Sequence, residues 1–102
     1  MKLYHRTARA NAESILREGF RDHTDYYMTR NLYTGVWFSS TPLDVNEGIL
    51  GDTVLCLSLD LNEADLAQYE WVEEGKGYRE WLMPAALVNI NGEVAIMEDL
   101  HG

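Results

Sequence analysis

The chain has few of the residues that define a disulfide-rich, metal-binding or membrane protein. It holds one cysteine, Cys56, so no disulfide can form within it. The histidines His5, His23 and His101 do not have the spacing of metal ligands, so we expect no metal site. No apolar run approaches the roughly 20 residues that a membrane helix needs. These scarcities exclude a disulfide scaffold and argue against a membrane partner.

Basic residues are also scarce. Eight Lys and Arg face 17 Asp and Glu, which gives a net charge of -9. Such a chain repels a phosphate backbone at long range, so nucleic acid is not an expected partner. A local basic pocket could still hold a dinucleotide. The segment from Met1 to Arg6 has no apolar signal region, and we expect a cytoplasmic protein.

Apolar residues are plentiful and spread along the whole chain. They make up 46% of its 102 residues, which is the composition of a globular protein and the length of one domain. We therefore expect residues 1–102 to form a single domain. Cys56 lies in the apolar run Val-Leu-Cys-Leu, and we expect it to be a thiol of the core.

The N-terminal part predicts a strand, over residues 3–7, followed by a helix. The apolar face of the helix has helical spacing and consists of Ala8, Ala12, Ile15 and Leu16. Asn11 is the expected N-cap, with Glu13 in the first turn. Gly19 ends the helix in a left-handed conformation, and Phe20 folds back onto it.

The next part predicts a long loop and then a strand. Residues 21–33 are polar and aromatic without a regular period. A loop of that length in a compact domain is usually functional, and its aromatic content favours a lid. Residues 35–39, Gly-Val-Trp-Phe-Ser, predict a strand, and residues 43–50 a short helical turn.

The second half of the chain predicts mostly strands. Residues 53–61 alternate in polarity, and Asn62 caps a short helix that runs through Ala67. An extended pattern over residues 78–83 stops at Pro84, which breaks the strand or marks a sheet edge. The pair Asn91-Gly92 between two apolar runs predicts a hairpin. One early helix followed mainly by strands indicates an α+β domain with a largely antiparallel sheet.

Three short motifs follow one another along the chain. They are Leu-Tyr-His-Arg-Thr at 3–7, a helix ending Ile-Leu-Arg-Glu-Gly-Phe at 15–20, and Gly-Val-Trp-Phe-Ser at 35–39. This order resembles the His–Tyr–Glu branch of the ADP-ribosyltransferase superfamily, the diphtheria-toxin and PARP-like branch. The resemblance implies a split antiparallel β-sheet with an early helix. It also implies that NAD is the substrate and that ADP-ribose is transferred to an acceptor or to water.

The resemblance assigns roles to five residues. His5 matches the histidine that bonds the adenosine ribose of NAD. Arg6 replaces a glycine whose backbone contacts the nicotinamide amide, and its charge could serve a pyrophosphate. Thr7 and Ser39 could position the nicotinamide ribose. Trp37 matches the tyrosine that stacks on the nicotinamide ring, and offers a flat face of larger area.

The late glutamate of the family is the catalytic residue, and Glu80 is its best match here. In the family this carboxylate bonds the nicotinamide ribose and stabilises an oxocarbenium-like transition state. Glu80 begins a late strand, whereas its rivals Glu73 and Glu74 occupy a turn-like stretch. The loop over residues 73–78 is where the family selects its acceptor. A protein is one candidate for the acceptor.

Other readings remain open beside this alignment. The second branch of the superfamily uses Arg, a Ser-Thr-Ser type strand and Glu-x-Glu, but Tyr78 stands where the first Glu would be. RNA 2′-phosphotransferases share the fold but need more basic residues than this chain has. Arg6 and Trp37 depart from the family pattern, so a binding module without activity is the main alternative. An interaction domain that uses exposed aromatic residues is a third reading.

Overall fold

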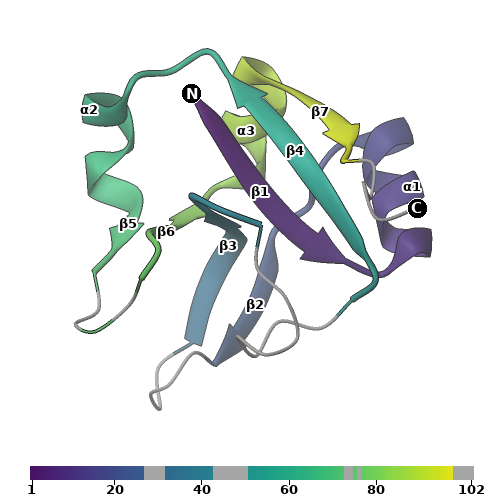
Figure 1. The fold of residues 1–102 in the computed structure, drawn as a ribbon, viewed down its shortest axis with the longest axis horizontal. Coiled ribbons are helices and arrows are strands. Elements are labelled where there is room, and N and C mark those ends of the chain that lie inside the picture. Colours follow the sequence, from purple (N-terminus) through teal and green to yellow (C-terminus); the bar gives the residue numbers. More distant parts are fainter. Residues whose placement is uncertain (27–31, 43–50, 73–74, 76, 98–102) are drawn as a thin grey trace.

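Seven strands and three α-helices make up the described part of the chain (Figure 1). The computed structural model describes residues 1–26, 32–42, 51–72, 75 and 77–97. The strands are β1 (Lys2–Thr7), β2 (His23–Tyr26), β3 (Leu32–Ser39), β4 (Thr53–Leu59), β5 (Glu70–Trp71), β6 (Glu80–Met83) and β7 (Gly92–Ile96). The helices are α1 (Arg9–Glu18), α2 (Glu63–Leu66) and α3 (Ala85–Asn91), with a 3-10 turn η2 (Ala67–Tyr69) after α2.

The strands form one antiparallel sheet in the order β5-β6-β3-β1-β4-β7, and β2 pairs with the first half of β3, off this path. β1 pairs with β4 along its whole length, from Lys2 opposite Ser58 to Thr7 opposite Thr53. With β3 it pairs at Tyr4 and Ser39, after which the two strands separate. The expected α+β class and antiparallel sheet are therefore confirmed.

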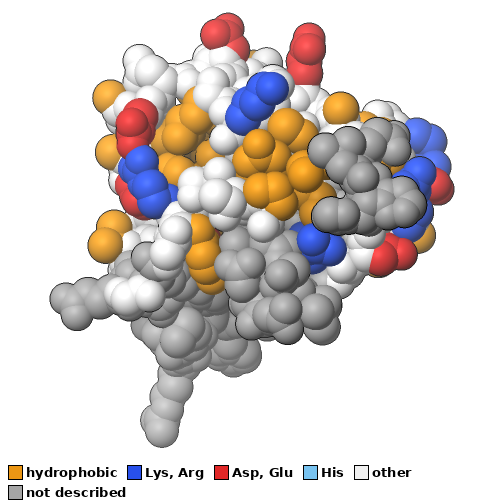
Figure 2. All heavy atoms as spheres, viewed as in Figure 1, with side chains coloured by type: hydrophobic (Ala, Val, Ile, Leu, Met, Phe, Trp, Pro, Cys, Tyr) orange, Lys and Arg blue, Asp and Glu red, His pale blue; other side chains and the backbone are white. Residues whose placement is uncertain are grey.

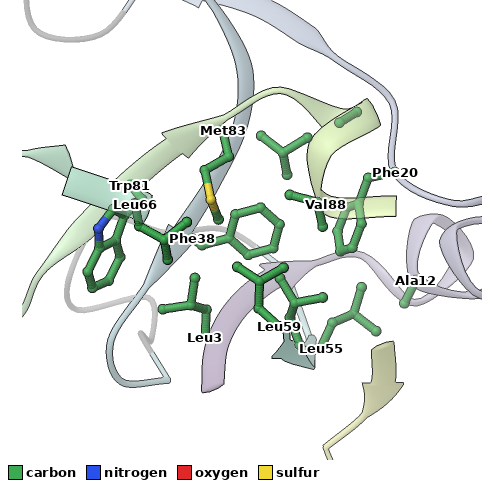
Figure 3. Close-up of a cluster of buried hydrophobic side chains, with 13 residues drawn as sticks. Leu3, Ala12, Phe20, Phe38, Leu55, Leu59, Leu66, Trp81, Met83 and Val88 are labelled. Carbon is green, nitrogen blue, oxygen red and sulfur yellow. The ribbon is translucent and has the colours of Figure 1, made fainter. Parts of the chain in front are cut away.

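The apolar core lies on the face of the sheet that α1 and α3 cover (Figure 3). Its buried members are Leu3, Ala12, Phe20, Val36, Phe38, Leu55, Leu57, Leu59, Leu66, Trp81, Met83, Ala85 and Val88. Because side chains alternate along a strand, the even residues of β1 and the odd residues of β3 face the other side. Cys56 also faces that side and is half-buried, so its assignment to the core was wrong. Leu16 is 44% exposed and likewise lies outside the core.

The beginning of α1 differs from the prediction. The helix begins at Arg9 after Ala8, so Asn11 is not its N-cap and Glu13 is not in its first turn. The cap comes from a distant residue: the carboxylate of Asp52 accepts the backbone N–H of Arg9 at 3.0 Å. The end of the helix is as predicted, since Gly19 has a φ of 86° and Phe20 is buried.

The segment over residues 21–33 is not one long loop. Residues 23–26 form β2, which pairs with β3 from His23 opposite Gly35 to Tyr26 opposite Leu32. The hydroxyls of Thr24 and Thr34 lie 2.7 Å apart across this pair. A strand reading His-Thr-Asp-Tyr has no alternation of apolar residues, so periodicity could not reveal it. The helical turn expected over residues 43–50 lies outside the described residues.

The predicted hairpin at Asn91-Gly92 is wrong, because residues 85–91 form α3. Pro84 precedes this helix in an extended conformation, and the carboxylate of Asp22 accepts the N–H of Ala85 at 2.8 Å. Gly92 then begins β7 with an extended backbone. A Cβ there would lie 2.6 Å from the side chain of Leu57, so the glycine serves close packing and not a turn.

The remaining elements agree with the sequence. β3 contains the strand predicted over residues 35–39. β4 ends at Leu59, two residues before the end of the strand predicted over residues 53–61. Asn62 caps α2 and forms a capping box with Asp65. In the described part of the chain, no helix combines the length and the apolar character needed to cross a bilayer.

The capping of α1 by Asp52 can be tested by mutation. Asp52→Ala should lower the free energy of unfolding by about 1 kcal/mol, because it leaves the N–H of Arg9 without its acceptor. For a domain of this size that corresponds to a fall in Tm of roughly 4 to 8 °C. Asn11→Ala is the matched control and should leave Tm nearly unchanged. Equal losses in the two variants, measured by thermal denaturation, would contradict the assignment.

Candidate functional site

A cavity of about 620 Å³ opens where β1 and β3 separate. Its walls come from the end of β1, one side of α1, the turn at residues 19–21, β2 and β3. Four of the six predicted site residues line it: His5, Arg6, Thr7 and Trp37. A volume of this size is typical of sites for small molecules and cofactors.

His5 bridges the two strands at the cavity. Its Nδ1 lies 2.7 Å from the backbone carbonyl oxygen of Trp37. A carbonyl can only accept, so Nδ1 carries the hydrogen and Nε2 remains an acceptor in the neutral ring. The ring packs against Phe20 and Phe38 at centroid distances of 5.6 and 5.7 Å. Burial lowers the pKa of His5 below 6.5 despite the opposing effect of the carbonyl, which keeps the imidazole neutral at pH 7.

The neighbours of His5 on β1 are held by residue 51 and by α1. The guanidinium of Arg6 donates to the carbonyl oxygen of Gly51 at 3.1 Å. Gly51 has a φ of 122°, and a Cβ there would lie 2.5 Å from the carbonyl carbon of Thr7. The hydroxyl of Thr7 accepts from the amide of Asn11 at 3.3 Å. The wall formed by β1 is therefore fixed by contacts from two other segments.

Trp37 belongs to a cluster of three aromatic rings. Its ring meets the ring of Trp71 edge to face at 5.8 Å, and Trp71 meets Tyr33 in the same way at 4.9 Å. Such T-shaped pairs are favourable because the positive edge of one ring meets the negative face of the other. Trp37 thus lines the cavity from a position braced by its aromatic neighbours.

Ser39 and Glu80 are paired with each other but do not line the cavity. They lie opposite each other on β3 and β6, and both are 5% exposed. The hydroxyl of Ser39 donates to the carbonyl of Thr41 at 2.7 Å. Strand alternation places Glu80 and Trp37 on the same face, because Ser39, which lies opposite Glu80, is two positions from Trp37 on β3. The structure therefore brings Glu80 beside Trp37, and outside the cavity that holds His5.

The first residues of β6 are fixed in place by Arg79. Its guanidinium forms two bonds to the carboxylate of Glu70, at 2.7 and 2.9 Å, and another to Glu63. Hydrogen bonding to Arg79 lowers the pKa of Glu70. The backbone carbonyl of Arg79 accepts from the N–H of Ser40, and the backbone N–H of Arg79 donates to the hydroxyl of Ser40, both at 2.9 Å. Glu80 follows directly, so its position depends on this anchor.

Four polar residues of the cavity were missed by the sequence analysis. Asn11 and Ser14 lie three positions apart on α1, and Arg21 and His23 follow its end. The helical spacing of Asn11 and Ser14 beside Ile15 was a usable signal. Arg21 and His23 gave none, because the segment that contains them was expected to be a loop. The rival glutamates Glu73 and Glu74 lie outside the described residues.

Comparison with known proteins found no matching family model, no matching curated protein and no matching solved structure. Within the described residues, no group of three or more His, Cys, Asp or Glu side chains is arranged to hold a metal ion. A functional proposal therefore rests on the resemblance of the motifs and on the cavity itself.

The neutral state of His5 predicts a dependence of stability on pH. In the unfolded chain the pKa of this group is 6.5, and in the folded protein it is lower. The unfolded state therefore binds more protons between these two values, and the free energy of unfolding falls as the pH drops through 6.5 toward the folded pKa. Above 6.5 this contribution is constant.

Urea denaturation at about pH 7.5 and at about pH 5.5 measures this effect. His5→Gln is the matched control, because its amide can still donate to the carbonyl of Trp37 but does not titrate. The wild type should lose more stability than His5→Gln between the two pH values. Equal losses would show that His5 is not held neutral by the fold.

Proposed function

We propose that this domain binds NAD in the cavity between β1 and β3 and cleaves the nicotinamide–ribose bond, transferring ADP-ribose to an acceptor or to water. One observation carries the proposal: three consecutive residues of β1, His5 to Thr7, and Trp37 of β3 line the same cavity. These segments are distant in sequence, and they are the ones whose motifs resemble the ADP-ribosyltransferases. Convergence of the motifs in space supports a common site.

The chemistry of the lining suits the parts of NAD. In the neutral ring of His5, Nε2 can accept a hydroxyl hydrogen of the adenosine ribose. Arg6 supplies positive charge for the pyrophosphate, while its bond to Gly51 holds the side chain at the cavity wall. Trp37 offers an aromatic face for the nicotinamide ring, and Thr7 a hydroxyl for the nearby ribose.

Glu80 is the proposed catalytic residue. Cleavage leaves positive charge on the ribose as nicotinamide departs with the bonding electrons, and a carboxylate near this charge lowers the barrier. Glu80 shares its face of the sheet with Trp37 and lies opposite Ser39. Arg79 anchors the strand just before it.

The binding half of the proposal is tested at Trp37. NAD should raise the Tm of the wild type, and Trp37→Leu should weaken NAD binding about tenfold through loss of ring stacking. Trp37→Phe keeps an aromatic face and should bind nearly as well as the wild type. Isothermal titration calorimetry measures all three. Equal affinity of the Leu and Phe variants would remove Trp37 from the site.

The catalytic half is tested at Glu80. Glu80→Gln should reduce release of free nicotinamide from NAD at least about a hundredfold, with NAD affinity largely kept. Glu93→Gln removes an exposed carboxylate from β7 and should release nicotinamide at the wild-type rate. Mass detection of nicotinamide after incubation with NAD gives the rates. Equal turnover in wild type and Glu80→Gln would overturn the assignment of Glu80.

A binding module without activity is the second candidate, and the position of Glu80 favours it. This side chain is 5% exposed and does not line the cavity, whereas a catalytic carboxylate must reach the ribose. A protein of this kind would show the same shift of Tm with NAD but no release of nicotinamide by the wild type. The two assays together distinguish an enzyme from a binding module.

A further inference from the structure

The cavity is basic although the protein is strongly acidic. Its lining contains two arginines, Arg6 and Arg21, beside the neutral imidazole of His5. No Asp or Glu is found among the described residues that line it. The whole chain, in contrast, has a net charge of -9. Local positive charge of this kind favours an anionic ligand.

Arg21 follows the C-terminal end of α1, whereas Arg6 precedes the N-terminal end of this helix. Both residues line the cavity. Arg21 follows the turn at Gly19 and Phe20, which is fixed because the amide of Asn89 bonds both backbone groups of Phe20, at 2.8 and 2.9 Å. The side chain of Arg21 is 78% exposed. It forms an ion pair of 2.9 Å with Glu18, on the last turn of the helix. Glu18 does not line the cavity.

We propose that Arg21 is a phosphate-binding residue, and that Arg6 and Arg21 bind the two phosphates of a nucleoside diphosphate group. A guanidinium has five N–H donors in a fixed plane, so Arg21 can bind a phosphate oxygen in addition to Glu18. Arg6 and Arg21 line the same cavity, so each guanidinium can bond one anionic group of a ligand that carries two. The inference rests on the proposed function in taking NAD as the natural ligand of this class.

Because the protein as a whole is acidic, an anionic ligand must be held by direct contacts with Arg6 and Arg21. Salt screens the repulsion between a net negative protein and an anion beyond about a Debye length, roughly 8 to 10 Å at moderate salt, so the repulsion acts only at shorter range. Binding must then come from direct contacts inside the cavity, where Arg6 and Arg21 are the residues of fixed positive charge. Glu18 opposes this binding, because its carboxylate competes with the ligand for Arg21. The same carboxylate accepts from the hydroxyl of Ser14 at 3.3 Å.

Because Glu18 competes with the ligand for Arg21, substitutions of these two residues should change the ligand affinity in opposite directions. The probes are inorganic pyrophosphate, ADP, NAD and uncharged adenosine, titrated calorimetrically into the folded protein. Arg21→Gln should weaken ADP and NAD binding about five- to tenfold, because one charge-assisted hydrogen bond is lost at an exposed site. Glu18→Gln should strengthen the same binding about twofold by removing the competing carboxylate. Arg17→Gln, an exposed position in the last turn of α1 outside the cavity, is the matched control.

Each result separates this inference from the proposed function. If pyrophosphate and ADP bind with the expected dependence on Arg21 while NAD does not bind, the phosphate site stands and the NAD proposal fails. If NAD binds the wild type and Arg21→Gln equally, the assignment of Arg21 is overturned while the proposed function stands. A loss in Arg17→Gln equal to that in Arg21→Gln would reduce the effect to net charge and overturn the site. Binding of adenosine should be the same in all variants.

Discussion

The hydrogen bond between the ring of His5 and the carbonyl of Trp37 is the contact on which the candidate site depends. It spans β1 and β3 where their pairing has ended, so it holds the strands at a fixed separation. The same contact determines which ring nitrogen carries the hydrogen and leaves the other as an acceptor. This one hydrogen bond therefore fixes both the separation of β1 and β3 at the cavity and the tautomer of the His5 ring.

Much of the fold could be predicted because its signals are local. The alternation of β4 and the capping box at Asn62 each depend on residues that are close together in the sequence. Both are present in the structure. The failures share one physical cause. α1 and α3 are capped by Asp52 and Asp22, which lie far from them in sequence. A search for caps among adjacent residues chose Asn11 and missed α3 altogether, because tertiary contacts supply what local sequence lacks.

The site was predictable to the extent that its residues occur in motifs. His5, Arg6, Thr7 and Trp37 meet at one cavity, as the motif order suggested. Glu80 was correctly placed at the start of a late strand, but its burial beside Ser39 depends on packing that no motif records. Arg21 was overlooked because it lies in a segment without periodicity. The role proposed for it rests on the residues that the folded chain brings to the cavity walls.

The contact between residue 51 and the end of β1 restricts how this sequence can change over time. No side chain fits at Gly51, because a Cβ would meet three backbone atoms of Thr7 at 2.5 to 2.8 Å. The next residue, Asp52, supplies the cap of α1. Each residue is constrained by its own contact, so divergent descendants of this chain that keep both contacts should keep Gly-Asp here even where their core residues have drifted. This dipeptide would then mark ancestry more durably than the strands around it.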